Sequence, residues 1–431
     1  MTMWGKQYLK NKSKDFFRTI DVPENLASIT DIDEASEVDA TEAGLSHAQV
    51  NAIWSAIEGF YRTGLYPGLS FCLRRHGKVV LNRAIGYSRG VRDEEGLDAP
   101  VPMTTNTPVC LYSASKAVMA MVVHKLAEDG YINLLDPVSH YIPAFGRNGK
   151  KNISIYQMLA HRGGFPMIEN DVPMDIMFER DKVLEIIYDM EALCEEGRVQ
   201  AYHAVTSGFI ADELVRVTTG QTIQEYMDTV LRNPLGMKYF TFGVPQAQRG
   251  QIALNYVSGM RNGKLIEKVL SKAFGVSIDT AVELSNSDNF LDAIVPSANL
   301  FATAEEIGRF YQMLLDSGNY RGREILKPVT IQKAVREAGG VRLDKGIFLP
   351  LRFSAGFMLG GKPVGMYGLN THYAYGHLGF SNIFCWADPQ RDISVSLLTT
   401  GKPVIGNHLL ALPKLMYTIS HECTPCEVVE K

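Results

Sequence analysis

Apolar residues recur at helical spacing in several stretches of the chain. From Ser46 to Tyr61 they fall three or four positions apart, which predicts an amphipathic helix with Ser46 as its N-cap. A continuous pattern from Ser113 to Asp129 predicts a second helix, closed by Gly130 at the position where glycine commonly ends a helix. Shorter patterns of the same kind predict further helices at residues 153–160, 182–192, 207–217, 223–231 and 304–316.

Strand patterns occur toward both ends of the chain. Residues 69–72 and 79–85 flank Arg75-His76-Gly77-Lys78, and residues 382–386 and 393–398 flank a second turn at 387–392, so each pair predicts a hairpin. Strands at both ends with helices between them do not alternate as βαβ units would. The order therefore predicts an α+β fold, with one antiparallel sheet built from both chain ends, flanked by helices, and a helical insertion.

This order divides the chain into three parts. Residues 1–45 form an N-terminal extension, residues 46–112 and 311–431 a sheet domain, and residues 113–310 a mainly helical domain. The extension is basic from Lys6 to Arg18 and acidic from Asp31 to Glu42. Such a composition predicts either a weakly ordered segment or an arm that packs only on the finished domain.

Composition narrows the class of protein. The chain has 431 residues, 46% of them apolar and 21% charged, with a net charge of −4, which is typical of a folded soluble protein. The absence of a basic excess argues against a nucleic-acid partner. No apolar run approaches the ~18 residues of a membrane span. The first residues contain no apolar secretory segment, so we expect a cytoplasmic protein; whether it forms a homo-oligomer is open.

Cysteine chemistry has one candidate, the C-x-x-C formed by Cys423 and Cys426. Such a pair can bind zinc or cycle as a disulfide, but no second ligand pair lies at zinc-site spacing. We therefore expect a structural role, and we predict neither a metal site nor a cofactor.

Two serine motifs compete for the role of nucleophile. Gly86-Tyr87-Ser88-Arg89-Gly90 has the G-x-S-x-G form of an α/β-hydrolase elbow, which works only as a sharp turn from a strand into a helix. Here polar loop residues follow instead. The sequence therefore predicts a glycine-flanked loop after a strand, without a catalytic role for Ser88.

The second motif, Ser113-Ala114-Ser115-Lys116, opens the long apolar helix. Residues three apart on a helix share a face, so the Lys116 amine can reach the Ser113 hydroxyl. Free backbone N–H groups and partial positive charge at a helix start can stabilise an oxyanion. Lysine acts as a base only where burial lowers its pKa, and the apolar run at 117–123 predicts such burial. The alternative is an N-cap serine beside a solvated lysine.

Several further segments accompany this motif in the order found in a known family. They are Tyr66-Pro67-Gly68-Leu69, Leu134-Leu135-Asp136-Pro137, Leu159-Ala160-His161-Arg162-Gly163-Gly164, Pro234-Leu235-Gly236-Met237 and Pro296-Ser297-Ala298-Asn299. From about Tyr66 to Gly401 the chain thus resembles the serine β-lactamase and penicillin-binding-protein superfamily. Within it, the chain is most similar to class C β-lactamases and family VIII carboxylesterases. The resemblance implies a β-lactamase-like fold.

The resemblance also implies roles for individual residues. Ser113 would be the acylated nucleophile and Lys116 the general base. Tyr202, in Tyr202-His203-Ala204, falls where the family has Tyr-x-Asn, and would protonate the leaving group and then activate water. Neighbouring positive charge would have to lower the pKa of such a phenol. The backbone N–H groups of Ser113 and Phe380 would form the oxyanion hole.

The chain departs from the family at two positions that concern the substrate. Ala204 replaces the asparagine of the second motif, and in the third motif, His377-Leu378-Gly379, a histidine replaces lysine. His377 is largely neutral at pH 7, whereas the carboxylate of a β-lactam normally meets positive charge there. Gly379 would let the substrate approach the strand closely.

These departures favour a serine carboxylesterase that cleaves small neutral esters, short in chain and modest in polarity, through an acyl-serine intermediate. The resemblance leaves other functions open. The chain could be a β-lactamase or DD-peptidase-like amide hydrolase, an acyltransferase, or a catalytically silent binding or structural member of the fold.

Overall fold

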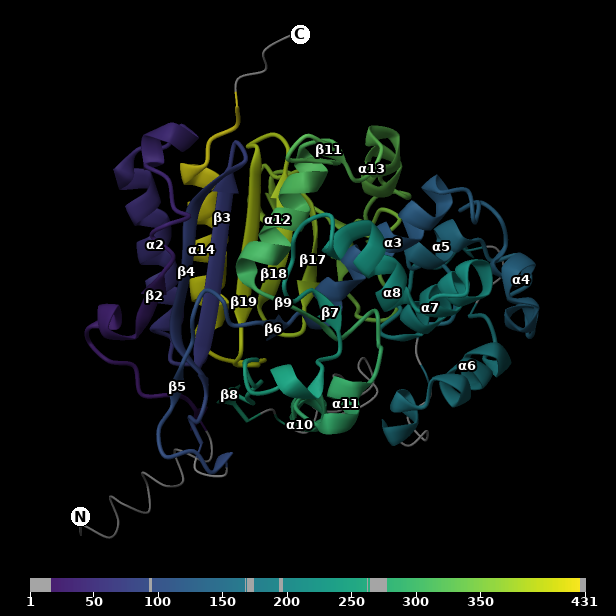
Figure 1. Ribbon diagram of the computed structural model, residues 1–431, viewed down its shortest axis with the longest axis horizontal. Helices are drawn as coiled ribbons and strands as arrows, with labels where there is room; N and C mark the ends of the chain where they lie inside the picture. The colour runs from purple at the N-terminus through teal and green to yellow at the C-terminus, as the bar shows by residue number, and fades with distance from the viewer. Residues whose placement is uncertain are drawn as a thin grey trace.

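The computed structural model describes residues 17–92, 95–166, 168, 174–193, 197–261, 263 and 277–426. Its centre is an antiparallel sheet with strands from both ends of the chain (Figure 1). The strand order is β14–β17–β18–β19–β3–β4–β2, and β5 pairs with β4. Their bounds are β2 Thr30–Ile32, β3 Gly68–Arg75, β4 Lys78–Arg89, β5 Val101–Pro102, β14 Met358–Leu359, β17 Tyr375–Gly379, β18 Ile383–Asp388 and β19 Ile393–Thr399. This arrangement confirms the predicted α+β fold.

Both predicted hairpins form. The turn between β3 and β4 consists of His76 and Gly77, both with positive φ, as tight hairpin turns require. The strand β4 is longer than predicted, because it continues through Ser88 to Arg89 and then pairs with β5. The prediction of a loop at residues 86–90 is therefore wrong. Ser88 is buried, and its hydroxyl donates to the carbonyl of Val101 at 3.2 Å.

Helices cover both faces of the sheet (Figure 1). On one face lie α2 (His47–Tyr61) and α14 (His408–Glu422), and on the other lies α12 (Ala304–Leu315). Along β3, Leu69, Phe71 and Leu73 join the apolar core beneath α2 and α14, whereas Cys72 joins the core on the side of α12. This alternation is the period of two expected for a strand buried on both faces.

The middle of the chain is mainly helical, as predicted. Its helices are α3 Ser115–Glu128, α4 Val138–Tyr141, α5 Ile155–Leu159, α6 Arg180–Asp189, α7 Thr206–Thr219, α8 Ile223–Met227, α10 Ile278–Ser285 and α11 Asp288–Asp292. This part also contains a small sheet in the order β6 (Val109–Cys110), β9 (Leu300–Ala302) and β7 (Thr241–Phe242). Its strand β6 comes shortly before α3 in the chain. Eleven of the fourteen residues of α3 are buried, so this helix runs through the core. The division of the chain into domains stays a prediction.

The described part of the N-terminal extension packs on the rest of the molecule. The strand β2 adds to the sheet beside β4, and β1 (Phe17–Arg18) pairs with β8 (Gly259–Met260). Arg18 also forms an ion pair with Asp279 of α10 at 2.8 Å. The basic residues before Phe17 lie outside the described residues.

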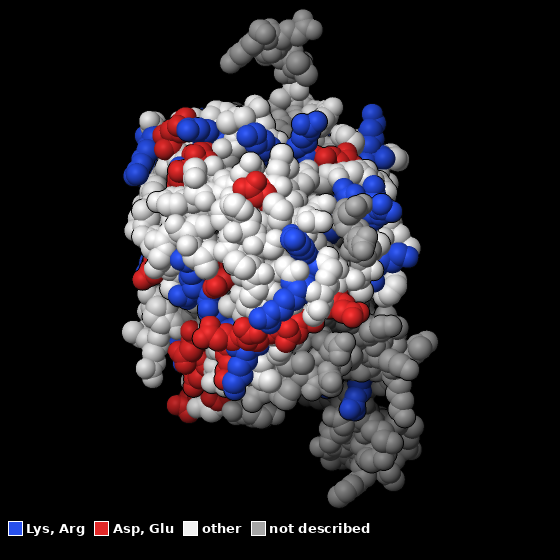
Figure 2. Space-filling model, turned by 90° about the vertical axis from the view of Figure 1, so that its right-hand side faces the viewer, with Lys and Arg blue, Asp and Glu red and all other residues white. Residues whose placement is uncertain are grey.

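The surface and the cysteines add little to the choice between functions. Figure 2 shows side chains of both charges on one face, separated by large uncharged areas. Among the described residues, no helix combines the length and apolar character needed to cross a bilayer. Cys423 is buried at the end of α14 and Cys426 is half-buried, both as free thiols.

Candidate active site

Ser113 lies in a single 3-10 turn, η4 (Tyr112–Ala114), directly before α3. Tyr112 has a φ of 46°, a left-handed conformation that is uncommon for a bulky residue. Its ring is buried, and its hydroxyl donates to Oγ of Ser285 at 2.7 Å, which helps to hold the turn. Backbone strain of this kind clusters at functional sites. Here it sits immediately before the predicted nucleophile.

Lys116, one turn further along, has its amine beside Ser113. Its Nζ lies 3.1 Å from Ser113 Oγ and donates to the carbonyls of Ala204 at 2.7 Å and Ser297 at 3.0 Å. The side chain is buried, and burial lowers the pKa of Lys116 well below its usual value. A neutral amine has two N–H groups and one lone pair. With both hydrogens donated to carbonyls, the lone pair faces the serine hydroxyl.

Tyr202 completes the cluster from a loop before α7. Its hydroxyl is hydrogen-bonded to Ser113, and Lys116 Nζ lies 4.8 Å from the centre of its ring. Burial raises the pKa of Tyr202, against the lowering effect of the hydrogen bond to Ser113. The expectation that nearby positive charge lowers this pKa is therefore wrong, because burial has the largest effect and no cation contributes to the shift. A lysine with a lowered pKa therefore lies beside a phenol with a raised pKa, the pair of groups that the predicted base and acid require.

Comparisons with known proteins identify the family of the chain. The model of the family described as Beta-lactamase matches residues 55–413, most of the chain. The chain belongs to this beta-lactamase family. It is 27% identical over 312 residues to "Esterase/beta-lactamase LipL" of Mycobacterium tuberculosis, covering 69% of this chain and 70% of that protein.

Solved structures show the same fold. The crystal structure of a family VIII carboxylesterase matches with a TM-score of 0.74 at 24% identity, covering 88% of this chain and 99% of the other. A penicillin-binding-protein homologue from Caulobacter crescentus matches with a TM-score of 0.73 at 23% identity, covering 88% and 98%. The chain is thus a serine hydrolase of the beta-lactamase family, in a fold shared by esterases and penicillin-binding proteins.

The third family motif lies on β17, next to the nucleophile turn. A Cβ atom at Gly379 would lie 2.4 Å from the carbonyl oxygen of Leu111, so glycine is required for the strand to pack against this turn. The ring of Phe380 lies 5.4 Å from that of Tyr112, and both line the cavity in front of Ser113. The strand therefore places Phe380 in the lining of the same cavity. The backbone N–H of this residue is the one predicted to stabilise the oxyanion.

His377 occupies a different place from the one expected of a substrate-binding residue. It is buried and is absent from the cavity lining, and its ring lies 6.1 Å from that of Tyr202. Nδ1 is 2.8 Å from the carbonyl of Leu378, so it carries the proton and donates it there. Burial lowers the pKa of His377 to about 3, with a further contribution from Lys116, which keeps the imidazole neutral.

The cavity in front of Ser113 has a volume of about 450 Å³ and an apolar lining. Its apolar residues come from the segment before α6, from α10 and α11, from the loop after Asp344, from β14, and from the end of β17 and the residue after it. They include Met177, Phe178, Leu284, Phe290, Ile347, Phe348, Leu349, Met358 and Phe380. No charged side chain of the described chain lines it. The cavity therefore suits an uncharged, apolar ligand.

Asp344 joins the site although no motif in the sequence marks it. Its buried Oδ1 accepts hydrogen bonds from the backbone N–H groups of Tyr202 at 2.9 Å, Gly346 at 2.8 Å and Ile347 at 3.2 Å. One carboxylate oxygen thus fixes both the loop of the predicted acid and the loop that lines the cavity. The Asp-x-Gly spacing of 344–346 signals a turn, but nothing in it points to Tyr202.

Proposed function

We propose that the chain hydrolyses neutral carboxylic esters with apolar substituents through an acyl-Ser113 intermediate. One observation carries this proposal: Ser113, Lys116 and Tyr202 lie together beside an apolar cavity that no charged side chain of the described chain lines. The apolar lining favours esters less polar than the sequence alone suggested.

Acylation begins when Ser113 Oγ attacks the ester carbonyl carbon and passes its proton to the neutral Lys116 amine. The backbone N–H groups of Ser113 and Phe380 stabilise the oxyanion. The bond to the alcohol oxygen then breaks as the Tyr202 hydroxyl protonates that oxygen, and the Lys116 ammonium returns a proton to the phenolate. Serine thus loses one proton and the alcohol gains one.

Deacylation repeats these steps with water as the nucleophile. Tyr202 and Lys116 remove a proton from the attacking water, and the same two backbone groups hold the second oxyanion. Collapse of this intermediate releases the carboxylic acid, and Ser113 Oγ takes back the proton. The cycle restores every group and needs no further reactant.

A β-lactam fits this site less well than an ester does. Its carboxylate would enter a cavity without a charged lining residue, and burying an unpaired carboxylate is costly. His377 stands where the family has the lysine that would meet this carboxylate, and it is neutral and does not line the cavity. The name of the relative LipL joins both activities, so β-lactam hydrolysis is the second candidate.

Two measurements test the proposal. Intact mass after incubation with a fluorophosphonate should show one adduct, mapped to Ser113 and absent from Ser113→Ala, while Ser88→Ala still reacts. Ser113→Ala should lower ester turnover by about 10⁴-fold or more. The kcat/KM for p-nitrophenyl butyrate should exceed that for nitrocefin. An adduct on Ser88 would refute the choice of nucleophile, and faster nitrocefin turnover would favour the second candidate.

A further inference from the structure

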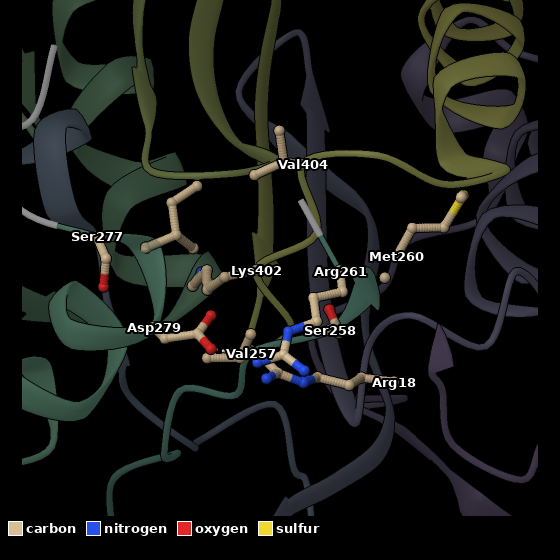
Figure 3. A pocket seen from close by; sticks show the side chains of 11 residues that line it. Arg18, Val257, Ser258, Met260, Arg261, Ser277, Asp279, Lys402 and Val404 are labelled. Atoms are coloured by element: carbon tan, nitrogen blue, oxygen red, sulfur yellow. Dashed lines mark hydrogen bonds and ion pairs between the residues drawn. The ribbon is translucent and has the colours of Figure 1, made fainter. Parts of the chain in front are cut away.

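A second cavity, of about 160 Å³, shares no lining residue with the catalytic cavity (Figure 3). The helix α10 separates the two: its first residues line the second cavity, while Ala281 and Leu284 line the catalytic one. The second cavity is basic, with Arg18, Arg261 and Lys402 in its lining and Asp279 as the single acid among the described residues. Charged and mostly basic side chains thus line the second cavity, whereas no charged side chain of the described chain lines the catalytic one.

Lys402 is a buried lysine without an acidic partner among the described residues. Its side chain is fully buried, and its Nζ donates to the carbonyl of Thr399 at 2.6 Å. In the described chain no carboxylate forms an ion pair with it; Asp279 pairs with Arg18 instead. A buried ammonium without a partner is costly. Burial lowers the pKa of Lys402 to about 7, so either the amine is neutral or an anion accompanies it.

Two more donors in this lining have no partner. The hydroxyl of Ser258 is buried and makes no hydrogen bond in the described structure. Arg261 is exposed at the cavity, and among the described residues it forms neither a hydrogen bond nor an ion pair. An ammonium, a guanidinium and a hydroxyl therefore line one small cavity with spare donors. Oxyanions provide the acceptors that such donors need.

We propose that this cavity binds a small oxyanion, a phosphate, a sulfate or a short carboxylate, held by Lys402, Arg261 and Ser258. The small volume excludes ligands of the size that typical ligand pockets hold. The bound anion supplies the negative partner that Lys402 lacks in the described chain, and it favours the ammonium form of Lys402.

The anion site is connected to the nucleophile turn. Lys402 Nζ lies 5.0 Å from the centre of the Tyr112 ring, and Tyr112 precedes Ser113 in the strained turn. A charged ammonium over an aromatic face is attracted to it, whereas a neutral amine is not. Anion binding therefore stabilises the turn that holds the nucleophile.

The test uses Ser113→Ala protein, so that its result does not depend on hydrolysis. Sulfate is titrated by calorimetry at constant ionic strength, with chloride as the compensating ion. We expect saturable binding at one site, lost in Lys402→Met and weakened about tenfold or more in Arg261→Ala. Arg336→Ala, which removes an exposed arginine elsewhere, should leave binding unchanged. Phosphate and acetate, titrated in the same way, show which oxyanion the site prefers.

Sulfate remains a dianion near neutral pH, so its binding reports the charge of the protein. Binding should weaken as the pH rises through about 7, where Lys402 loses its proton. The groups facing Lys402 are Tyr112, Cys110 and, across the cavity, Arg18, Arg261 and Asp279. The proposal is wrong if no saturable binding occurs, or if Arg261→Ala binds sulfate as the parent does. The exposed Arg261 keeps this test valid even if Lys402→Met fails to fold.

Discussion

Two buried lysines lie close to the nucleophile turn, and their surroundings differ. Lys116 and Lys402 are each buried without a carboxylate partner in the described chain, and each lies close to a tyrosine ring. Lys116 donates to two carbonyls and has the Ser113 hydroxyl as its third neighbour. Lys402 donates to one carbonyl and has a basic cavity beside it.

If both proposals hold, burial alone does not make a lysine a catalytic base. Burial lowers the pKa in both cases. At Lys116, two carbonyls take both hydrogens of the neutral amine and direct its lone pair to a hydroxyl. At Lys402 no second carbonyl of the described chain does so, and donors remain for an anion. The arrangement of acceptors decides between a base and an anion-binding group.

The largest expected difference between the two lysines is catalytic. Lys116→Met should lower kcat for an ester by about 10³–10⁴-fold, because Ser113 loses the base that takes its proton. Lys402→Met should lower it by no more than about 30-fold, since one buried cation–π contact contributes only about 2 kcal/mol. Steady-state kinetics on purified variants, with circular dichroism to establish folding, measure both. Equal losses in the two variants would contradict the assignment of the base.

The fold was largely predictable from the sequence, because its signals are local. Helical spacing gave α2 with Ser46 as its N-cap, and the His76-Gly77 turn gave the first hairpin. The error at residues 86–90 has a tertiary cause. Two glycines and a polar flank favour a loop locally, but pairing with β5 extends the strand through Ser88.

The site was predictable only where the motif residues lie close in sequence or match the family. Ser113 and Lys116 are three positions apart, so helix geometry alone brings them together. Asp344 reaches Tyr202 across 142 positions, and no local pattern encodes that contact. Lys402 sits in Gly401-Lys402-Pro403, which has the composition of an ordinary surface turn, yet its side chain is buried.

Removing the phenol hydroxyl should have the next largest effect. Tyr202→Phe should lower kcat by about 10²–10³-fold for an alkyl ester, because the departing alkoxide then lacks an acid. The loss should be smaller for a p-nitrophenyl ester, whose leaving group needs no proton. Tyr131→Phe, at an exposed tyrosine, is the matched control. An equal loss for both esters would show that Tyr202 does not protonate the leaving group.

The smallest expected loss of activity is that of Asp344 variants, because Asp344 only holds the backbone of Tyr202 in place. Asp344→Ala removes the acceptor of three buried backbone N–H groups and should lower the free energy of unfolding by about 1–3 kcal/mol. It should also lower kcat about tenfold, because Tyr202 is no longer held beside Ser113. Asp344→Asn keeps one acceptor oxygen and should restore most of kcat. Denaturant unfolding and kinetics on both variants separate the two effects. If Asp344→Asn is as slow as Asp344→Ala, the charge of Asp344 matters rather than the position it gives Tyr202.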